Sequence, residues 1–162
     1  MTAYLGADID AVYTDLDEGK TPALGDVVWV KNKAYKFVQY LEGAAATDGV
    51  AGEVVGFYAP SGTSAGSYTT VTSDYSDTAR VGAGVLVSAM SDAEYGWIQI
   101  KGPATLSIAL TAGGDGDPLT IDGAGDGTLD AVANDAASGY LSHVCAVVID
   151  ATDPIILCDF PF

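Results

Sequence analysis

The stretch GAGVLVSAMSDAEYGWIQIKGPATLSIALTAGGDGDPLTI, residues 82–121, decides the fold class of this chain. Short runs of β-branched and aromatic residues alternate in it with Gly, Asp, Ser and Pro clusters, and no segment leaves room for a long helix. Similar runs recur on both sides, so the sequence predicts an all-β protein. The runs expected to form strands are Val27–Val30, Tyr35–Gln39, Val54–Tyr58, Val85–Met90, Trp97–Lys101, Leu106–Leu110, Pro118–Ile121, Val144–Ile149 and Pro154–Asp159.

The length of 162 residues fits one domain with a hydrophobic core of its own. No long Ser- or Pro-rich linker divides the chain, so we expect a single compact β-barrel or β-sandwich over residues 25–162, with long Gly- and Asp-rich loops. Residues 1–24 differ, because acidic side chains are interleaved there with Ile9, Val12 and Leu16. We expect an extended N-terminal arm that orders on a neighbour, or alternatively a short helix.

Acidic residues outnumber basic ones by 22 to 6, which gives a formal net charge of −16. This charge repels nucleic-acid phosphates and anionic membranes, and we expect neither as a partner. The cations are unevenly placed, since none follows Lys101. We interpret the lysines of 31–36 either as part of an ordinary acidic, soluble surface or as a docking face for an acidic partner.

The start of the chain lacks the basic and apolar regions of a signal peptide, and no run is long and apolar enough to span a membrane. We therefore expect synthesis in a cytoplasm, where thiols stay reduced. Segments 143–149 and 154–160 have the pattern of a hairpin, and pairing Ile149 with Pro154 places Cys145 opposite Cys158. Two interpretations remain open: buried thiols that act as small hydrophobic side chains, or a disulfide formed in an oxidising medium.

No motif in the sequence supports an enzyme. Gly62–Gly66 matches G-x-S-x-G, but a β-type run follows it where a nucleophile elbow requires a helix. The single histidine, His143, is expected at the rim of a strand, and nothing places it near Ser64. Two cysteines and one histidine without paired spacing exclude a structural zinc site. We expect no catalytic residue and no cofactor.

Asp-Gly turns between residues 113 and 130 are candidate calcium ligands. An EF-hand loop that starts at Asp122 has Ala124 and Ala133 where ligands belong. Pro118 interrupts a calcium β-roll repeat at the position of a ligand Asp. Ordinary turns, in which Asp binds its own backbone and Gly adopts a positive φ, explain the same residues. We expect no resident metal, with a weak calcium site as the alternative.

Alternation in the run Trp97–Lys101 places Trp97, Gln99 and Lys101 on one face and Ile98 and Ile100 on the other. One face is expected to be core and the other to meet water or a neighbour.

Residues 95–104, YGWIQIKGPA, are followed by GDGDPL at 114–119 and by a closing Val-rich strand pair. With VQY at 38–40 and GEVVGF at 52–57, they resemble the small β-rich decoration, or cement, proteins of tailed-bacteriophage capsids. The resemblance covers residues 25–157 and implies a non-enzymatic protein of the virion exterior that is made in the host cytoplasm. It also implies binding to the major capsid protein at three-fold or quasi-three-fold positions, often as a homotrimer, which braces the shell against internal DNA pressure.

Apolar side chains near the ends of the chain are the expected anchors, because aromatic rings supply contact area with little loss of entropy. The alternative is that they cover the chain's own barrel. Other functions left open are another virion part, such as a tail-tube, head-completion or fibre-base protein, and a calcium- or carbohydrate-binding β module. The expected contact residues are Tyr4, Leu5, Tyr13, Trp97, Phe160 and Phe162, with Lys31, Lys33 and Lys36 as electrostatic partners.

Overall fold

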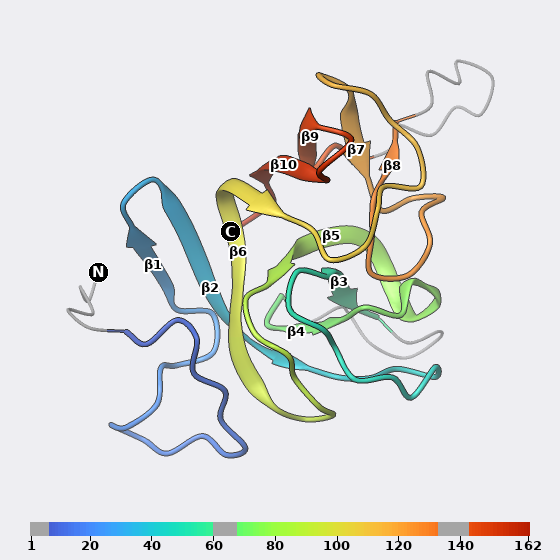
Figure 1. Ribbon diagram of the computed structural model, residues 1–162. Helices are drawn as coiled ribbons and strands as arrows, with labels where there is room; N and C mark the ends of the chain where they lie inside the picture. Colours follow the sequence, from blue (N-terminus) through green and yellow to red (C-terminus); the bar gives the residue numbers. More distant parts are fainter. Residues whose placement is uncertain (1–6, 60–67, 133–142) are drawn as a thin grey trace.

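The computed structural model describes residues 7–59, 68–132 and 143–162, and within them the chain is all-β (Figure 1). In these ranges one mixed sheet of ten strands is accompanied by a single 3₁₀ turn, η1 (Tyr75–Asp77). No helix in these ranges is long and apolar enough to cross a membrane. The strands are β1 (Val27–Val30), β2 (Lys33–Tyr40), β3 (Val54–Tyr58), β4 (Thr70–Thr72), β5 (Thr78–Leu86), β6 (Tyr95–Thr105), β7 (Pro118–Thr120), β8 (Asp130–Ala131), β9 (Ala146–Asp150) and β10 (Ile155–Asp159).

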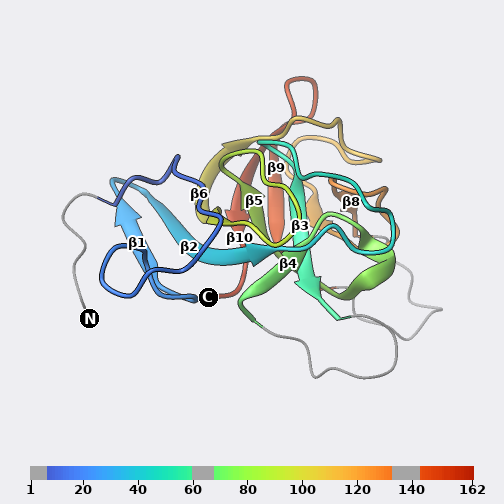
Figure 2. The same cartoon turned by 90° about the horizontal axis from the view of Figure 1, so that it is seen from below.

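Five of the strands close into a partial barrel. The sheet order is β1-β2-β4-β3-β5-β6-β10-β9-β7-β8, and an additional pairing joins β2 to β6. The ring β2-β4-β3-β5-β6 is antiparallel except for the parallel pair β2 and β4. β6 is the longest of the described strands, and beyond the ring it pairs with β10, so β10, β9, β7 and β8 extend the sheet away from the barrel (Figure 1). Figure 2, seen from below, shows β9 and β10 overlapping the ring strands. The predicted compact β fold is confirmed.

Alternation along β2 and β6 separates two hydrophobic clusters. Val38 and Ile98 belong to the main core, which fills the ring and continues under β7, β9 and β10. Phe37 and Trp97 point to the other side, where they form a second cluster with Val28 and Tyr35. Residues Ala7, Ile9, Tyr13 and Leu24 of the N-terminal segment pack against this second cluster.

The described part of the N-terminal segment, residues 7–24, contains no helix. Tyr13 and Tyr95 exchange two backbone hydrogen bonds, each with an N···O distance of 2.8 Å. These bonds and the apolar contacts below them fasten the segment to its own chain. Both faces of β6 are therefore covered around Trp97, and the expectation that one of the two faces meets water or a neighbour is wrong there.

Two predicted strands differ most from the observed ones, and β4 and β8 were not predicted. β5 ends at Leu86 instead of continuing to Met90, and it begins as early as Thr78. The run Leu106–Leu110 is not a strand, although its alternation suggested one. Its backbone forms hydrogen bonds with irregular segments instead. Leu106 N–H donates to the Pro154 carbonyl, and Ser107 N–H donates to the Gly52 carbonyl. Leu106 is buried as a loop residue.

The closing hairpin forms, but in a shifted register. Asp150 faces Ile155, and after a bulge Cys158 faces Ala146, so the predicted opposition of Cys145 and Cys158 is wrong. The turn spans residues 151–154 instead of 150–153, and in it the Asp150 carboxylate accepts hydrogen bonds from the backbone N–H groups of Thr152 and Asp153. Both cysteines are free and buried.

Candidate functional site

The structure disperses the predicted contact residues. Tyr4 and Leu5 lie outside the described residues. Trp97 is 1% exposed and its ring packs edge-on against Phe37, with 5.1 Å between the ring centroids. Phe160 is fully buried in the main core beneath β5. Phe160 thus matches the alternative interpretation, that the apolar ends cover the chain's own barrel. Neither its side chain nor that of Trp97 is at the surface of this chain.

The close approach of Phe160 depends on a glycine. A Cβ atom at Gly82 would lie 2.9 Å from the Phe160 ring and 3.1 Å from the Cys145 sulfur. β5 can therefore cross the terminal segment only because Gly82 has no side chain. The contact between Phe160 and Gly82 fixes the end of the chain on the barrel, two residues before the exposed Phe162.

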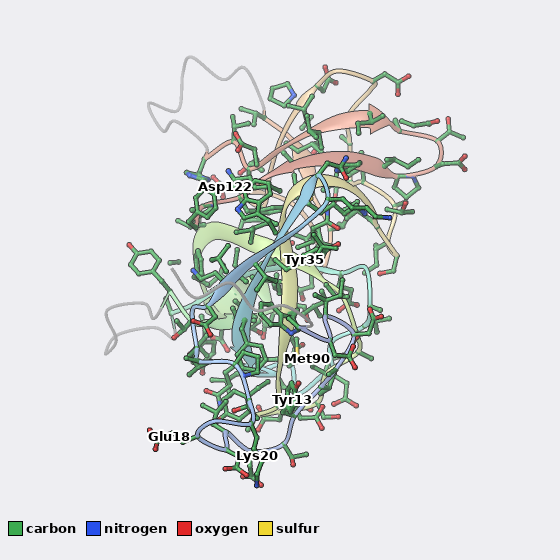
Figure 3. The ribbon with its side chains drawn as sticks, turned by 90° about the vertical axis from the view of Figure 1, so that its left-hand side faces the viewer. Tyr13, Glu18, Lys20, Tyr35, Met90 and Asp122 are labelled. Carbon is green, nitrogen blue, oxygen red and sulfur yellow. The ribbon has the colours of Figure 1, made fainter. Side chains whose placement is uncertain are left out.

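Tyr13 is half-buried and contacts Phe37 edge-on, with ring centroids 5.8 Å apart. The nearby charged residues of the same segment lie at its outer side, where the Lys20 amine and the Asp17 carboxylate form an exposed ion pair of 2.6 Å. Figure 3 shows Tyr13, Glu18 and Lys20 at the opposite end of the molecule from Asp122. Tyr13 therefore packs against the second cluster, and its side chain is only partly exposed at the surface.

The three predicted electrostatic partners have different environments. Lys31 is exposed at the tip of the β1–β2 hairpin, where its φ of 56° is of the kind that tight hairpin turns require. Lys33 is half-buried beside it. Lys36 is 4% exposed, and its Nζ lies 5.0 Å from the centroid of the Phe57 ring. Burial lowers the pKa of Lys36. Only the first two lysines are placed to meet a partner.

Phe162 is exposed and lies against a charged pair. Its ring centroid is 4.9 Å from the Lys101 Nζ, and that amine also binds the Asp159 carboxylate. A lysine between an aromatic face and a carboxylate has lost much of its freedom, so the terminal ring is held in a defined place. Of the predicted aromatic anchors in the described ranges, Phe162 is the one whose ring is available to a partner.

The more exposed of the two tryptophans, Trp29, was not among the predicted contact residues. Trp29 in β1 is 61% exposed, and its neighbour Val30 is exposed as well. β1 lies at the edge of the sheet and pairs only with β2 among the described strands. The signal was present in the run VVWV followed by Lys31, because alternation from the buried Val28 turns Trp29 to the opposite face. The β1–β2 hairpin tip, defined as Trp29, Val30, Lys31 and Lys33, joins apolar area to positive charge.

The acidic loops form ordinary turns and bridges. Asp117 accepts a hydrogen bond from Gly114 N–H, Asp126 accepts one from Tyr75 N–H, and Asp122 pairs with Arg80 at 3.2 Å. No group of three metal-ligating side chains is found within the described ranges. The contacts of Asp117, Asp122 and Asp126 are those of turns and bridges between loops.

A cavity of about 230 Å³ brings four carboxylates together at the base of η1. Burial raises the pKa of Glu53, which still accepts a hydrogen bond from Val50 N–H. Burial alone would also raise the pKa of Asp74. Hydrogen bonds from Ser76, Ala45 and Ala44 outweigh this effect, so the pKa of Asp74 is lowered. Backbone N–H groups of the surrounding loops donate hydrogen bonds to the carboxylates of Glu53, Asp74 and Asp126. The lining residues are Glu42, Ala45, Thr47, Glu53, Ser73, Asp74, Asp126 and Gly127.

The two thiols lie in the core near the terminal hairpin. Burial raises the pKa of both Cys145 and Cys158 to about 12. A thiol with such a pKa holds almost no thiolate at neutral pH and is a poor nucleophile and metal ligand. These residues act as small hydrophobic side chains under β9 and β10.

No protein-family model, curated protein or solved structure matches this chain. The fold and the surface therefore carry the functional argument, and they define an acidic all-β protein with a partial five-stranded barrel and exposed apolar side chains at its sheet edge.

Proposed function

We propose that this chain is a structural protein of a tailed-bacteriophage virion, a decoration or cement protein that binds the outer surface of the capsid. The observation that carries the proposal is the β1–β2 hairpin tip, where Trp29 is 61% exposed next to Val30 and Lys31. Tryptophan is enriched among the residues that dominate binding energy, and an exposed one on an edge strand favours a protein partner.

The sequence resemblance to capsid decoration proteins supports the same function. A cement protein works by contacting several subunits at once, so shallow contacts add up without a deep site. In this proposal the chain binds the major capsid protein at three-fold or quasi-three-fold positions as a homotrimer, and its net charge of −16 keeps particles apart. The protein acts without catalysis and without a cofactor.

Binding to empty shells tests the function. Shells of the virus that encodes this chain, assembled without it, are mixed with the purified protein and sedimented. We expect stoichiometric co-sedimentation and shells that resist heating better than before. Light scattering on the free chain measures the oligomer. A protein that ignores shells but forms rings or tubes alone would contradict the proposal and favour a tail component.

Trp29→Ala is the variant that tests the hairpin tip, and Val50→Ala is its matched control, because Val50 is another exposed apolar side chain outside the strands. We expect Trp29→Ala to weaken shell binding at least about tenfold, which is a common cost of removing a central anchor. Val50→Ala should bind like the unmodified protein. Equal binding by all three proteins would remove the hairpin tip from the proposal.

A further inference from the structure

The outer face of β6, β10, β9 and β7 carries a row of apolar side chains. Leu157 pairs with Pro103 on one side and with Val147 on the other, and Val147 pairs with Pro118. Directly paired residues of neighbouring strands point to the same face of a sheet. The row therefore crosses four strands, and we call it the terminal sheet face.

These side chains are open to solvent. Leu157 is 47% exposed, Val147 36% and Ile149, two residues along β9, 47%. The residues between them face the core, since Val148, Ile156 and Cys158 are buried. An antiparallel hairpin with one solvated face normally alternates apolar with polar residues. β9 and β10 are apolar on both faces, so their outer face has the composition of a surface that is covered.

Carboxylates surround this face. Asp150 and Asp153 occupy the turn between β9 and β10, and Asp115 is fastened to that turn by a bond of 2.9 Å from Ala151 N–H. Asp159 lies at the other end of β10, where Lys101 binds it and Phe162 lies on Lys101. The sequence contains no Lys or Arg after Lys101, so the terminal strands present only negative charge apart from this one lysine.

The negative charge around the terminal sheet face determines what kind of surface can bind there. A second copy of the chain would bring the same carboxylates and another 16 negative charges against this rim, which disfavours self-association through it. A surface with apolar side chains at its centre and Lys or Arg around them is complementary in both respects. We propose that the terminal sheet face is a docking surface for such a protein surface, separate from the β1–β2 hairpin tip. The proposal rests on the proposed function, under which the basic surface belongs to the capsid shell.

The test uses the double variant Val147→Thr/Leu157→Thr, because threonine is β-branched and suits a strand, while its hydroxyl makes the outer face more polar. Val50→Thr makes the same kind of change at an exposed loop position and is the control. Thermal unfolding and circular dichroism verify that each variant folds. We expect the double variant to bind empty shells at least about tenfold more weakly than the unmodified protein and the control to bind equally.

A second measurement addresses the charge. Asp153→Asn removes one carboxylate of the rim, and unlike Asp150 this residue contributes no side-chain cap to the turn among the described hydrogen bonds. We expect shell binding of the unmodified protein to weaken with added salt, and Asp153→Asn to show weaker binding and a shallower salt dependence. Salt-independent binding would overturn the basic partner.

The outcomes separate the two proposals. If the unmodified protein binds shells and the double variant binds equally, the terminal sheet face is not a docking surface, while the proposed function stands. If the unmodified protein does not bind shells, both proposals fail. If the double variant changes the oligomeric mass in light scattering, a second copy occupies the face and the inference is overturned.

Discussion

The amine of Lys36 lies over the ring of Phe57 at 5.0 Å, with only 4% of the lysine exposed. No carboxylate pairs with this amine among the described ion pairs, so an aromatic face is its principal electrostatic partner. The charged amine loses more hydration energy on burial than it gains from the aromatic ring. Burial therefore lowers the pKa of Lys36.

Lys36→Met should stabilise the protein. The substitution keeps the length of the side chain against Phe57 and removes the buried charge, and we expect the free energy of unfolding at pH 7 to rise by about 1 kcal/mol. Because the unfolded chain holds the Lys36 proton more tightly than the folded chain does, the penalty fades as pH rises towards the ordinary value of 10.5. Urea unfolding at pH 7 and pH 9.5 should show a smaller advantage at the higher pH. Lys33→Met is the control, and an equal gain there would refute the explanation.

The thiols should be inert in the folded protein. Burial raises the pKa of Cys145 and Cys158 to about 12, so neither forms a useful fraction of thiolate at pH 8. We expect no reaction with a chromogenic disulfide reagent in buffer and reaction of both cysteines in urea. Rapid labelling of either residue in the folded state would show that the terminal hairpin opens, or that its packing differs from that described.

Tyr13→Ala should loosen the second cluster. The variant loses the edge-on contact with Phe37 and leaves the backbone bonds to Tyr95 in place, and we expect a loss of about 2 kcal/mol in the free energy of unfolding. Leu16→Ala, an exposed position of the same segment, should change stability by less than about 0.5 kcal/mol. Equal effects would mean that the segment is held by its backbone alone.

The two tryptophans should report on different parts of the molecule. Trp97 is buried and Trp29 is exposed, so Trp29→Phe should leave blue-shifted emission that acrylamide quenches poorly. In Trp97→Phe the remaining Trp29 should emit at longer wavelength and be quenched readily. Addition of shells should then protect Trp29 from acrylamide. Unchanged quenching on saturated shells would place the hairpin tip outside the contact.

Local patterns in the sequence were sufficient for the fold class and for several strand positions, including Val27–Val30 and Val54–Tyr58 as observed. They could not reveal the hairpin register, because that depends on where the turn falls and on a bulge between Ile155 and Ile156. They also could not show that Trp97 is covered, because part of its cover comes from residues 7–24, which are 73 to 90 positions away in the chain. A single aromatic residue in an alternating run fits a core or an interface equally well.

The same limit explains the contact residues. Phe160 and Phe162 look equivalent in sequence. In the structure Phe160 packs against Gly82 in the core, while Phe162 is exposed. Trp29 was overlooked because it stands in a short strand whose neighbours are apolar, and its exposure follows from the edge position of β1 in the sheet. Pairing order between distant strands is not encoded in local alternation.

β6 has a mechanical consequence. The strand pairs with β2 and β5 in its first half and with β10 in its second half, without a break in the chain. A load applied to β10 is therefore passed along one continuous backbone into the ring, where it is shared by two neighbouring strands. The terminal strands and the barrel are therefore mechanically coupled. We expect them to unfold together, in one cooperative transition, when the molecule is pulled or heated.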